Sequence, residues 1–147
     1  SAGLPPELER RLRDEHPDVV LFHVLAPPLF FPEPVLREAA ELALRSGAAA
    51  VIAHGSHSFA PIERRGSQVI AWGLGNLAFD CECTTEDEGL LVRLEFAEHQ
   101  LVRASVVPVR AGLHGARAQL LDSPLLWQTL ENIGSSAFTR RGAVADF

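Results

Sequence analysis

The chain has 147 residues, a formal net charge of −6 and a hydrophobic content of 47%. This length corresponds to one domain, and this apolar content is enough for a core, which excludes an intrinsically disordered protein. The 13 basic residues are all arginines and form no dense basic run, so nucleic-acid binding is not expected.

The first half of the chain alternates helical and strand patterns. Residues 5–16 predict a helix, because two prolines stand at its start and Leu8 and Leu12 are four residues apart. Residues 18–24 (DVVLFHV) are apolar and β-branched, which predicts a buried strand. Residues 25–34 contain four prolines and predict a loop.

A second helix and a second strand follow this loop. Residues 33–47 carry an apolar stripe and end at Gly47, which predicts a helix with a glycine stop. Residues 48–54 (AAAVIAH) predict a short buried strand. The order strand, helix, strand predicts that the two strands are parallel and joined by a right-handed crossover.

The second half of the chain is predicted to be mainly strands. Residues 68–80 contain an apolar run that Gly73 and Gly75 interrupt. Residues 90–96 and 101–109 alternate apolar and polar side chains on both sides of a turn, which predicts a β-hairpin.

A last helix is predicted for residues 123–138, with Ser123 as its N-cap and Pro124 at the first helical position. Together the elements predict an α/β domain with a mixed sheet and flanking helices.

Polar side chains follow three of the predicted strands. His23 closes the first strand, His54 closes the second with His57 in the next turn, and Asn76 follows the third apolar run. The carboxyl ends of strands in open α/β sheets are where sites gather, so we expect these side chains to converge. Imidazole suits Zn, Mn and Fe, and an amide oxygen can complete the shell of a harder ion. The pattern predicts a metal site, with hydrogen-bonded structural histidines as the alternative.

The two cysteines and the common catalytic motifs suggest no other chemistry. Cys81 and Cys83 are two residues apart and would point to opposite faces of an extended segment, so we expect a loop with two free thiols. The sequence contains no nucleophile elbow, no phosphate-binding loop and no dinucleotide-binding glycine motif.

The order of four sequence blocks resembles a known protein family. The blocks are VVLFHVL, LRSGAAAVIAHGSHSFAPIE, VIAWGLGNLAFD and GLLVRLEF. In this order they resemble the carboxyl-terminal half of bacterial capsule-synthesis proteins of the CapA, poly-γ-glutamate type, which have the calcineurin-like metallophosphatase fold. The resemblance covers residues 18–138. It implies that residues 1–147 form a single partial domain, equivalent to half of an αββα sandwich.

The resemblance also implies roles for five residues. His23, His54 and His57 would be ligands of a centre of two divalent metal ions (Mn, Fe or Zn), and His54 would in addition be catalytic. Asn76 and Glu63 fall on family positions that hold the ligands in place or bind substrate.

The chain departs from the family pattern at several of these positions. Val24 and Leu25 replace Trp-Gly, Gly55 stands where many relatives have a further histidine, Ser56 replaces proline and Gly73 replaces serine. The aspartates, the bridging carboxylate and the Asn-His pair of the fold belong to its amino-terminal half. We therefore expect a partner segment, on the same or a separate chain, to carry them.

The resemblance implies a metal-dependent hydrolase that acts on a peptide, polyglutamate or phosphoester substrate. One alternative is a metal-dependent peptide epimerase in which His54 abstracts the Cα proton, and another is a metal-free scaffold or interaction domain. Family members are often membrane-anchored and extracytoplasmic. The sequence has no signal peptide and no apolar run of 18 residues, so the compartment stays open between the cytoplasm and that setting.

Overall fold

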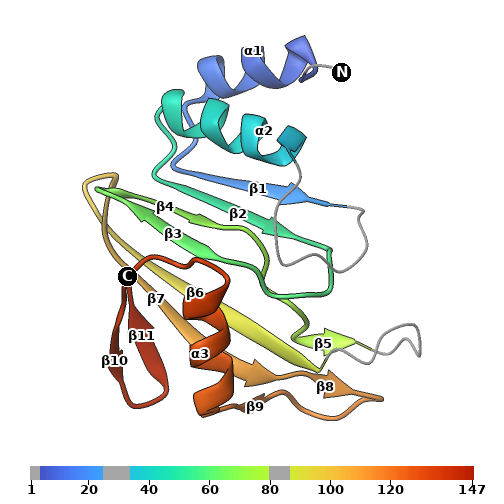
Figure 1. Cartoon of the computed structure of the whole chain (residues 1–147). Helices are drawn as coiled ribbons and strands as arrows, with labels where there is room; N and C mark the ends of the chain where they lie inside the picture. Colours follow the sequence, from blue (N-terminus) through green and yellow to red (C-terminus); the bar gives the residue numbers. More distant parts are fainter. Residues whose placement is uncertain (1–3, 25–33, 80–86) are drawn as a thin grey trace.

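The structure is a computed structural model that describes residues 4–24, 34–79 and 87–147 (Figure 1). Its helices are α1 (Pro6–Glu15), α2 (Pro34–Arg45) and α3 (Pro124–Asn132). The strands of the first half are β1 (Val19–His23), β2 (Ala50–His54), β3 (Ile62–Arg65), β4 (Gln68–Ala71) and β5 (Ala78–Phe79). Those of the second half are β6 (Glu88–Ala97), β7 (Gln100–Arg110), β8 (Gly112–Leu113), β9 (Gln119–Leu120), β10 (Thr139–Arg141) and β11 (Val144–Asp146).

The first sheet has the strand order β1-β2-β4-β3. β1 pairs with β2 in parallel, and β2 pairs with β4 in parallel, which confirms the parallel pairing predicted for the first two strands. β3 runs antiparallel to β4 at the far edge of the sheet. The sequence did not predict β3, because its four residues, IERR, show no apolar alternation.

Helices α1 and α2 cover one face of the first sheet (Figure 1). The buried residues of α2 are Ala39, Ala40, Ala43 and Leu44. These mostly small side chains lie in one cluster with Val51 and Ile70 from the strands below. The apolar stripe predicted for this helix is therefore the surface with which it contacts the sheet.

The second sheet is antiparallel and has the order β10-β11-β7-β6, with β9 beside β7. β6 and β7 form the predicted hairpin, in which Leu90 lies opposite Pro108 and Val92 lies opposite Val106. The two sheets share one core, because Ile62 and Val69 of the first sheet pack in the same cluster as Leu90 and Val106. The predicted α/β class with a mixed sheet is confirmed: α1 and α2 form a layer over the first sheet, the second sheet packs on its other face, and β5 and β8 form a separate two-stranded parallel sheet (Figure 1).

Helix α3 is shorter than the sequence predicted. It begins after the N-cap Ser123, whose hydroxyl accepts a hydrogen bond from the Leu126 amide at 3.3 Å, but it ends at Asn132. Gly134 has a φ of +94°, and the following chain runs beside β3, where the Ser136 amide donates to the Ile62 carbonyl at 2.8 Å. The prediction of a helix to residue 138 is therefore wrong, since backbone bonds to a distant strand replace the helical ones.

Two sequence predictions lie outside the described residues. The free thiols of Cys81 and Cys83 fall there, and so does nearly all of the proline-rich loop predicted for residues 25–34. Across the part of the chain that is described, no helix is long and apolar enough to cross a membrane.

Candidate functional site

His23 and His54 meet at the carboxyl edge of the first sheet. They are the last residues of β1 and β2 and are direct partners in the parallel register. Their Nδ1 atoms are 3.4 Å apart and their ring centroids 4.9 Å apart. The strand-end position of the two histidines thus decides that the two imidazoles touch.

Gly55 makes this approach of the two imidazoles sterically possible. It has a φ of +99°, and a Cβ placed on it would lie 2.6 Å from the Val24 carbonyl oxygen and 2.9 Å from Cε1 of His23. Those distances are shorter than van der Waals contact, so the chain requires the absence of a side chain here. Gly55 therefore lies directly against the His23 ring.

His57 lies in the turn after β2 and bonds to Asn76. Its Nδ1 is 3.0 Å from Oδ1 of Asn76, a side chain that is only 6% exposed. A carbonyl oxygen accepts and cannot donate, so the ring donates from Nδ1 and a neutral His57 keeps its lone pair on Nε2. His57 also has a φ of +62°, a backbone conformation that is uncommon for residues other than glycine.

Three other histidines, His16, His99 and His114, also have a positive φ, so this conformation alone does not mark a site. Metal-binding histidines commonly donate their second ring nitrogen to a carbonyl or carboxylate oxygen, which fixes the orientation of the ring. The hydrogen bond of His57 to Asn76 therefore has the arrangement of a ligand with its orienting partner.

Glu63, the fifth residue singled out in the sequence, lies on the other face of the sheet. It is opposite Ile70 in the β3–β4 register, and Ile70 packs under the helices. His54 lies two residues after Ile52 in β2 and so points to the same face, and Ile52 packs toward the core between the sheets. Glu63 therefore shares the carboxyl edge with the histidines but points to α2 rather than to the imidazoles.

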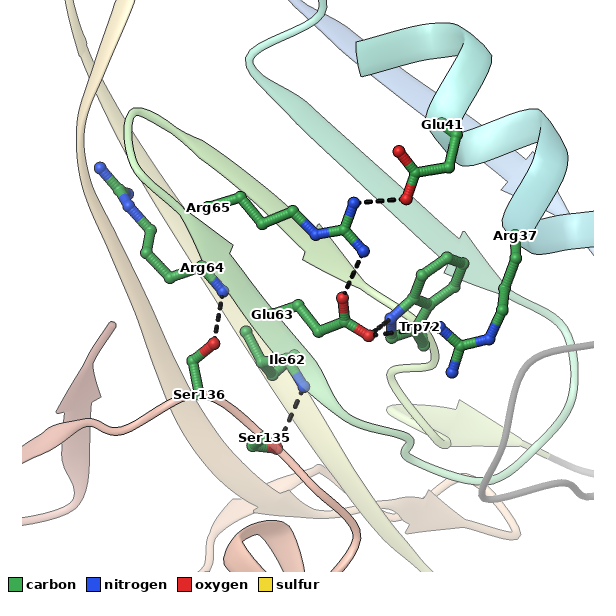
Figure 2. A network of polar contacts seen from close by, with 9 residues as sticks. All are labelled: Arg37, Glu41, Ile62, Glu63, Arg64, Arg65, Trp72, Ser135 and Ser136. Atoms are coloured by element: carbon green, nitrogen blue, oxygen red, sulfur yellow. Dashed lines mark hydrogen bonds and ion pairs between the residues drawn. The ribbon is translucent and has the colours of Figure 1, made fainter. Parts of the chain in front are cut away.

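A polar network surrounds Glu63 (Figure 2). Its carboxylate accepts a hydrogen bond from the indole Nε1 of Trp72 at 2.6 Å and one from Arg65 at 2.7 Å. Arg65 also bonds to Glu41 of α2, and the guanidinium of Arg37 lies over the Trp72 ring, 5.0 Å from its centroid. This network holds the end of β4 and the start of β3 against α2.

The ionisation of Glu63 follows from these contacts. Burial raises the pKa of its carboxyl, but the hydrogen bonds from Arg65 and Trp72 and the charge of Arg37 outweigh burial, so the pKa lies below its ordinary value. Sequence reasoning did not single out Arg37, Arg65 or Trp72. The sequence offers two signals, the adjacent arginines Arg64 and Arg65 and the indole of Trp72 just after an apolar run. Neither signal shows that these side chains contact Glu63.

The donors at this edge fit part of a metal centre. Two ligands of a tetrahedral ion with metal–nitrogen bonds of about 2.0–2.1 Å lie about 3.3–3.4 Å apart, which matches the separation between the Nδ1 atoms of His23 and His54. The same separation suits a shared proton. Within residues 4–24, 34–79 and 87–147, no three His, Cys, Asp or Glu side chains lie close enough to hold a metal ion. The structure thus brings together one imidazole pair and, separately, His57 with Asn76.

Comparison with known proteins finds a similarity to one family in the first half of the chain. Residues 9–81 match the sequence model of the bacterial capsule synthesis protein PGA_cap. The match includes both strand-end histidines, the turn with His57, and Asn76. No curated protein matches the chain significantly.

Proposed function

Because residues 9–81 match the sequence model of the bacterial capsule synthesis protein family, we propose that this chain supplies the imidazole ligands of a divalent-metal enzyme. The observation that carries the proposal is the Nδ1–Nδ1 distance of 3.4 Å between His23 and His54. Imidazole nitrogens at this separation can bind one ion. The proposed fold is half of a metallophosphatase-type αββα sandwich, which the stacking of a helical layer on two sheets supports.

Each residue of the site has a defined part in this proposal. His23 and His54 would hold one cation through Nδ1, and His57, which does not lie close enough to form a three-ligand group with them, would offer Nε2 to the second ion, with Asn76 fixing the plane of its ring. A bound divalent cation polarises a carbonyl or phosphoryl oxygen. His54, at the tip of β2, would accept a proton only while its Nδ1 is not bound to the ion, because a neutral imidazole that ligates through Nδ1 carries its proton on Nε2 and has no second lone pair.

The ligands that neutralise a divalent ion are carboxylates, and we propose that they come from a segment added beside β1. Among the described strands, β1 pairs with β2 alone, so its other edge has no strand partner there. Leu21 in the middle of β1 is 64% exposed, and a pocket of about 330 Å³ runs between β1 and α1. A strand paired in parallel with β1 would end next to His23.

The substrate class follows from the family and remains part of the proposal. On the resemblance to capsule-synthesis proteins of the poly-γ-glutamate type, which the match of residues 9–81 supports, we propose hydrolysis of a peptide or polyglutamate chain. A phosphoester substrate is the second choice within the same chemistry. Proton abstraction at Cα, which would epimerise a peptide, uses the same histidines with His54 as the base.

Metal binding by the purified protein tests the proposal. After loading with Mn²⁺, Fe²⁺ or Zn²⁺ the wild type should bind metal, and His54→Ala should lower the affinity at least about tenfold. His114→Ala is the matched control, because His114 is exposed in the turn after β8, outside the site. Less than about 0.1 metal per chain, with no effect of His57→Ala, would instead support the metal-free scaffold.

The type of reaction is tested in D₂O with a γ-linked glutamyl peptide and a matched α-linked peptide. Cleavage without deuterium at Cα supports hydrolysis, whereas deuterium at Cα without cleavage contradicts hydrolysis and supports epimerisation. His54→Ala should abolish either product, since both reactions need the same base.

A further inference from the structure

The loop that carries Asn76 crosses the first residues of β6 at two glycines. Gly75 and Gly89 form an isolated antiparallel bridge. Two backbone hydrogen bonds flank the bridge, from the Leu90 amide to the Leu74 carbonyl at 2.7 Å and from the Asn76 amide to the Glu88 carbonyl at 3.3 Å. These bonds make Gly75 and Gly89 a non-hydrogen-bonded pair, the kind in which the two Cα atoms come closest.

Neither glycine tolerates a side chain at this crossing. A Cβ on Gly89 would collide with the carbonyl oxygen of Asn76 and would lie 2.9 Å from its carbonyl carbon. A Cβ on Gly75, whose φ is +66°, would lie 3.0 Å from Cα of Gly89 and would collide with the Glu88 carbonyl oxygen. The atoms in the way are backbone atoms, so the clash can be relieved only by moving one of the two segments.

From this geometry we infer that Gly89 is a positioning residue, which acts through Asn76 on the tautomer of His57. Asn76 is 6% exposed and its Oδ1 accepts from Nδ1 of His57 at 3.0 Å. Because β6 holds the backbone of Asn76, a shift at Gly89 moves the oxygen that keeps the proton on Nδ1. Gly89 lies beyond residues 9–81, so a residue of the antiparallel sheet outside the family match would position two residues that lie within it.

The functional value of keeping the His57 proton on Nδ1 rests on the proposed function, because a lone pair on Nε2 matters only when His57 is a metal ligand. The tautomer itself does not depend on a metal ion. Nitrogen NMR of the metal-free protein at about pH 8.5, where an ordinary histidine is neutral, reads it directly. The wild type should show His57 with its proton on Nδ1, and Gly89→Ala should move the proton to Nε2.

Two further variants separate positioning from general destabilisation. Asn76→Ala removes the acceptor and should give the same tautomer change as Gly89→Ala. Gly142→Ala is the matched control in the turn between β10 and β11 of the same sheet. A Cβ there meets nothing within 4 Å, although its φ of +65° adds strain. Gly142→Ala should lower the thermal stability and leave His57 in the wild-type tautomer.

The outcomes are distinct from those that test metal binding. A wild type with its His57 proton on Nε2, or a folded Gly89→Ala with the proton still on Nδ1, overturns the inference. If Gly89→Ala does not fold, the wild-type protein decides. The inference then requires that its spectrum show the His57 proton on Nδ1 and a strong nuclear Overhauser effect between the Hα protons of Gly75 and Gly89. The expected tautomers without metal binding would refute only the proposed function. If the wild type does bind metal, Gly89→Ala should lower the metal affinity about 10- to 100-fold.

Discussion

At the scale of single residues, the site depends on positions that have no side chain. Gly55 lies against the His23 ring, and Gly73 lies against the loop that follows His57, where a Cβ would be 2.7 Å from the Ser58 carbonyl oxygen. Each of these glycines permits two segments to approach more closely than any other residue allows. The positions of the imidazoles therefore depend on these two glycines as well as on the histidines.

Gly55→Ala should separate the two imidazoles. The added Cβ would lie 2.9 Å from Cε1 of His23 on a backbone with a φ of +99°, so the ring must move and the backbone is strained. We expect the affinity for a divalent ion to fall at least about tenfold, as measured by isothermal titration calorimetry.

The matched control for this change is Gly66→Ala. Gly66 has a φ of +60° but a Cβ there meets nothing within 4 Å, so this variant carries the backbone strain without the collision. It should lower the free energy of unfolding by about 1 kcal/mol and leave metal affinity unchanged. Equal metal affinities in the two variants would show that Gly55 does not hold the imidazole pair.

At the scale of elements, side chains join each strand end to the helix or loop beside it. The Glu63 network fastens β3 and β4 to α2, and the hydroxyls of Ser135 and Ser136 accept hydrogen bonds from the amides of Ile62 and Arg64 on β3 (Figure 2). The edge strand β3 is thus covered by the segment after α3. This protects an edge that would otherwise be open to pairing with another chain.

Glu63→Gln should make the fold less stable and less sensitive to acid. The pKa of the Glu63 carboxyl is lowered in the folded state, so its charge stabilises the fold above about pH 4.5, and this stabilisation is lost as the pH falls through the folded pKa. At pH 7 the variant should lose about 1–3 kcal/mol of unfolding free energy. Below about pH 4.5 the curves of wild type and variant should converge in urea titrations.

Glu131→Gln provides the comparison, because Glu131 is exposed on α3. It should leave the stability within about 0.5 kcal/mol of the wild type. A constant difference between wild type and Glu63→Gln from pH 7 to pH 3 would contradict a lowered pKa as the source of the effect.

Ser123→Ala should destabilise α3 from its first turn. The Ser123 hydroxyl accepts from the Leu126 amide, and the helix buries Leu126, Trp127 and Leu130 in the core between the sheets. Loss of the cap should cost about 1 kcal/mol in thermal or chemical unfolding. Ser123→Asp should restore most of this stability, and an alanine variant as stable as the wild type would show that the cap contributes nothing.

At the scale of the whole molecule, the layers are covered unequally. Helices α1 and α2 cover one face of the first sheet and the second sheet covers part of the other, but Leu21 on β1 stays 64% exposed (Figure 1). An exposed apolar side chain on a strand edge favours pairing with another segment. We therefore expect the chain to associate with itself as its concentration rises.

Leu21→Lys should reduce this association with little change in stability, because the side chain is mainly exposed and a lysine on an edge strand disfavours pairing. Sedimentation velocity over a range of concentrations measures the effect. Leu125→Lys, on α3 at 71% exposure, is the matched control and should associate like the wild type. A wild type that stays monomeric at every concentration would contradict an open edge at β1.

The sequence by itself determined the elements whose signal is local. The prolines before α1, the apolar stripe of α2, the alternation in β6 and β7, and the strand-end positions of His23 and His54 all follow from short-range patterns. These patterns also determined the α/β class. Parallel pairing of β1 with β2 followed from the helix between them, and it places the two histidines opposite each other.

Only the tertiary structure decided the contacts between segments distant in the chain. α3 ends early because Ser136 bonds to β3, and Glu63 points to α2 because the β3–β4 register places it opposite Ile70, which no local pattern indicates. The pairing of His57 with Asn76 depends on a glycine crossing with β6. Packing and strand register decide such contacts between residues far apart in the sequence, and the local sequence around each residue does not identify its partner.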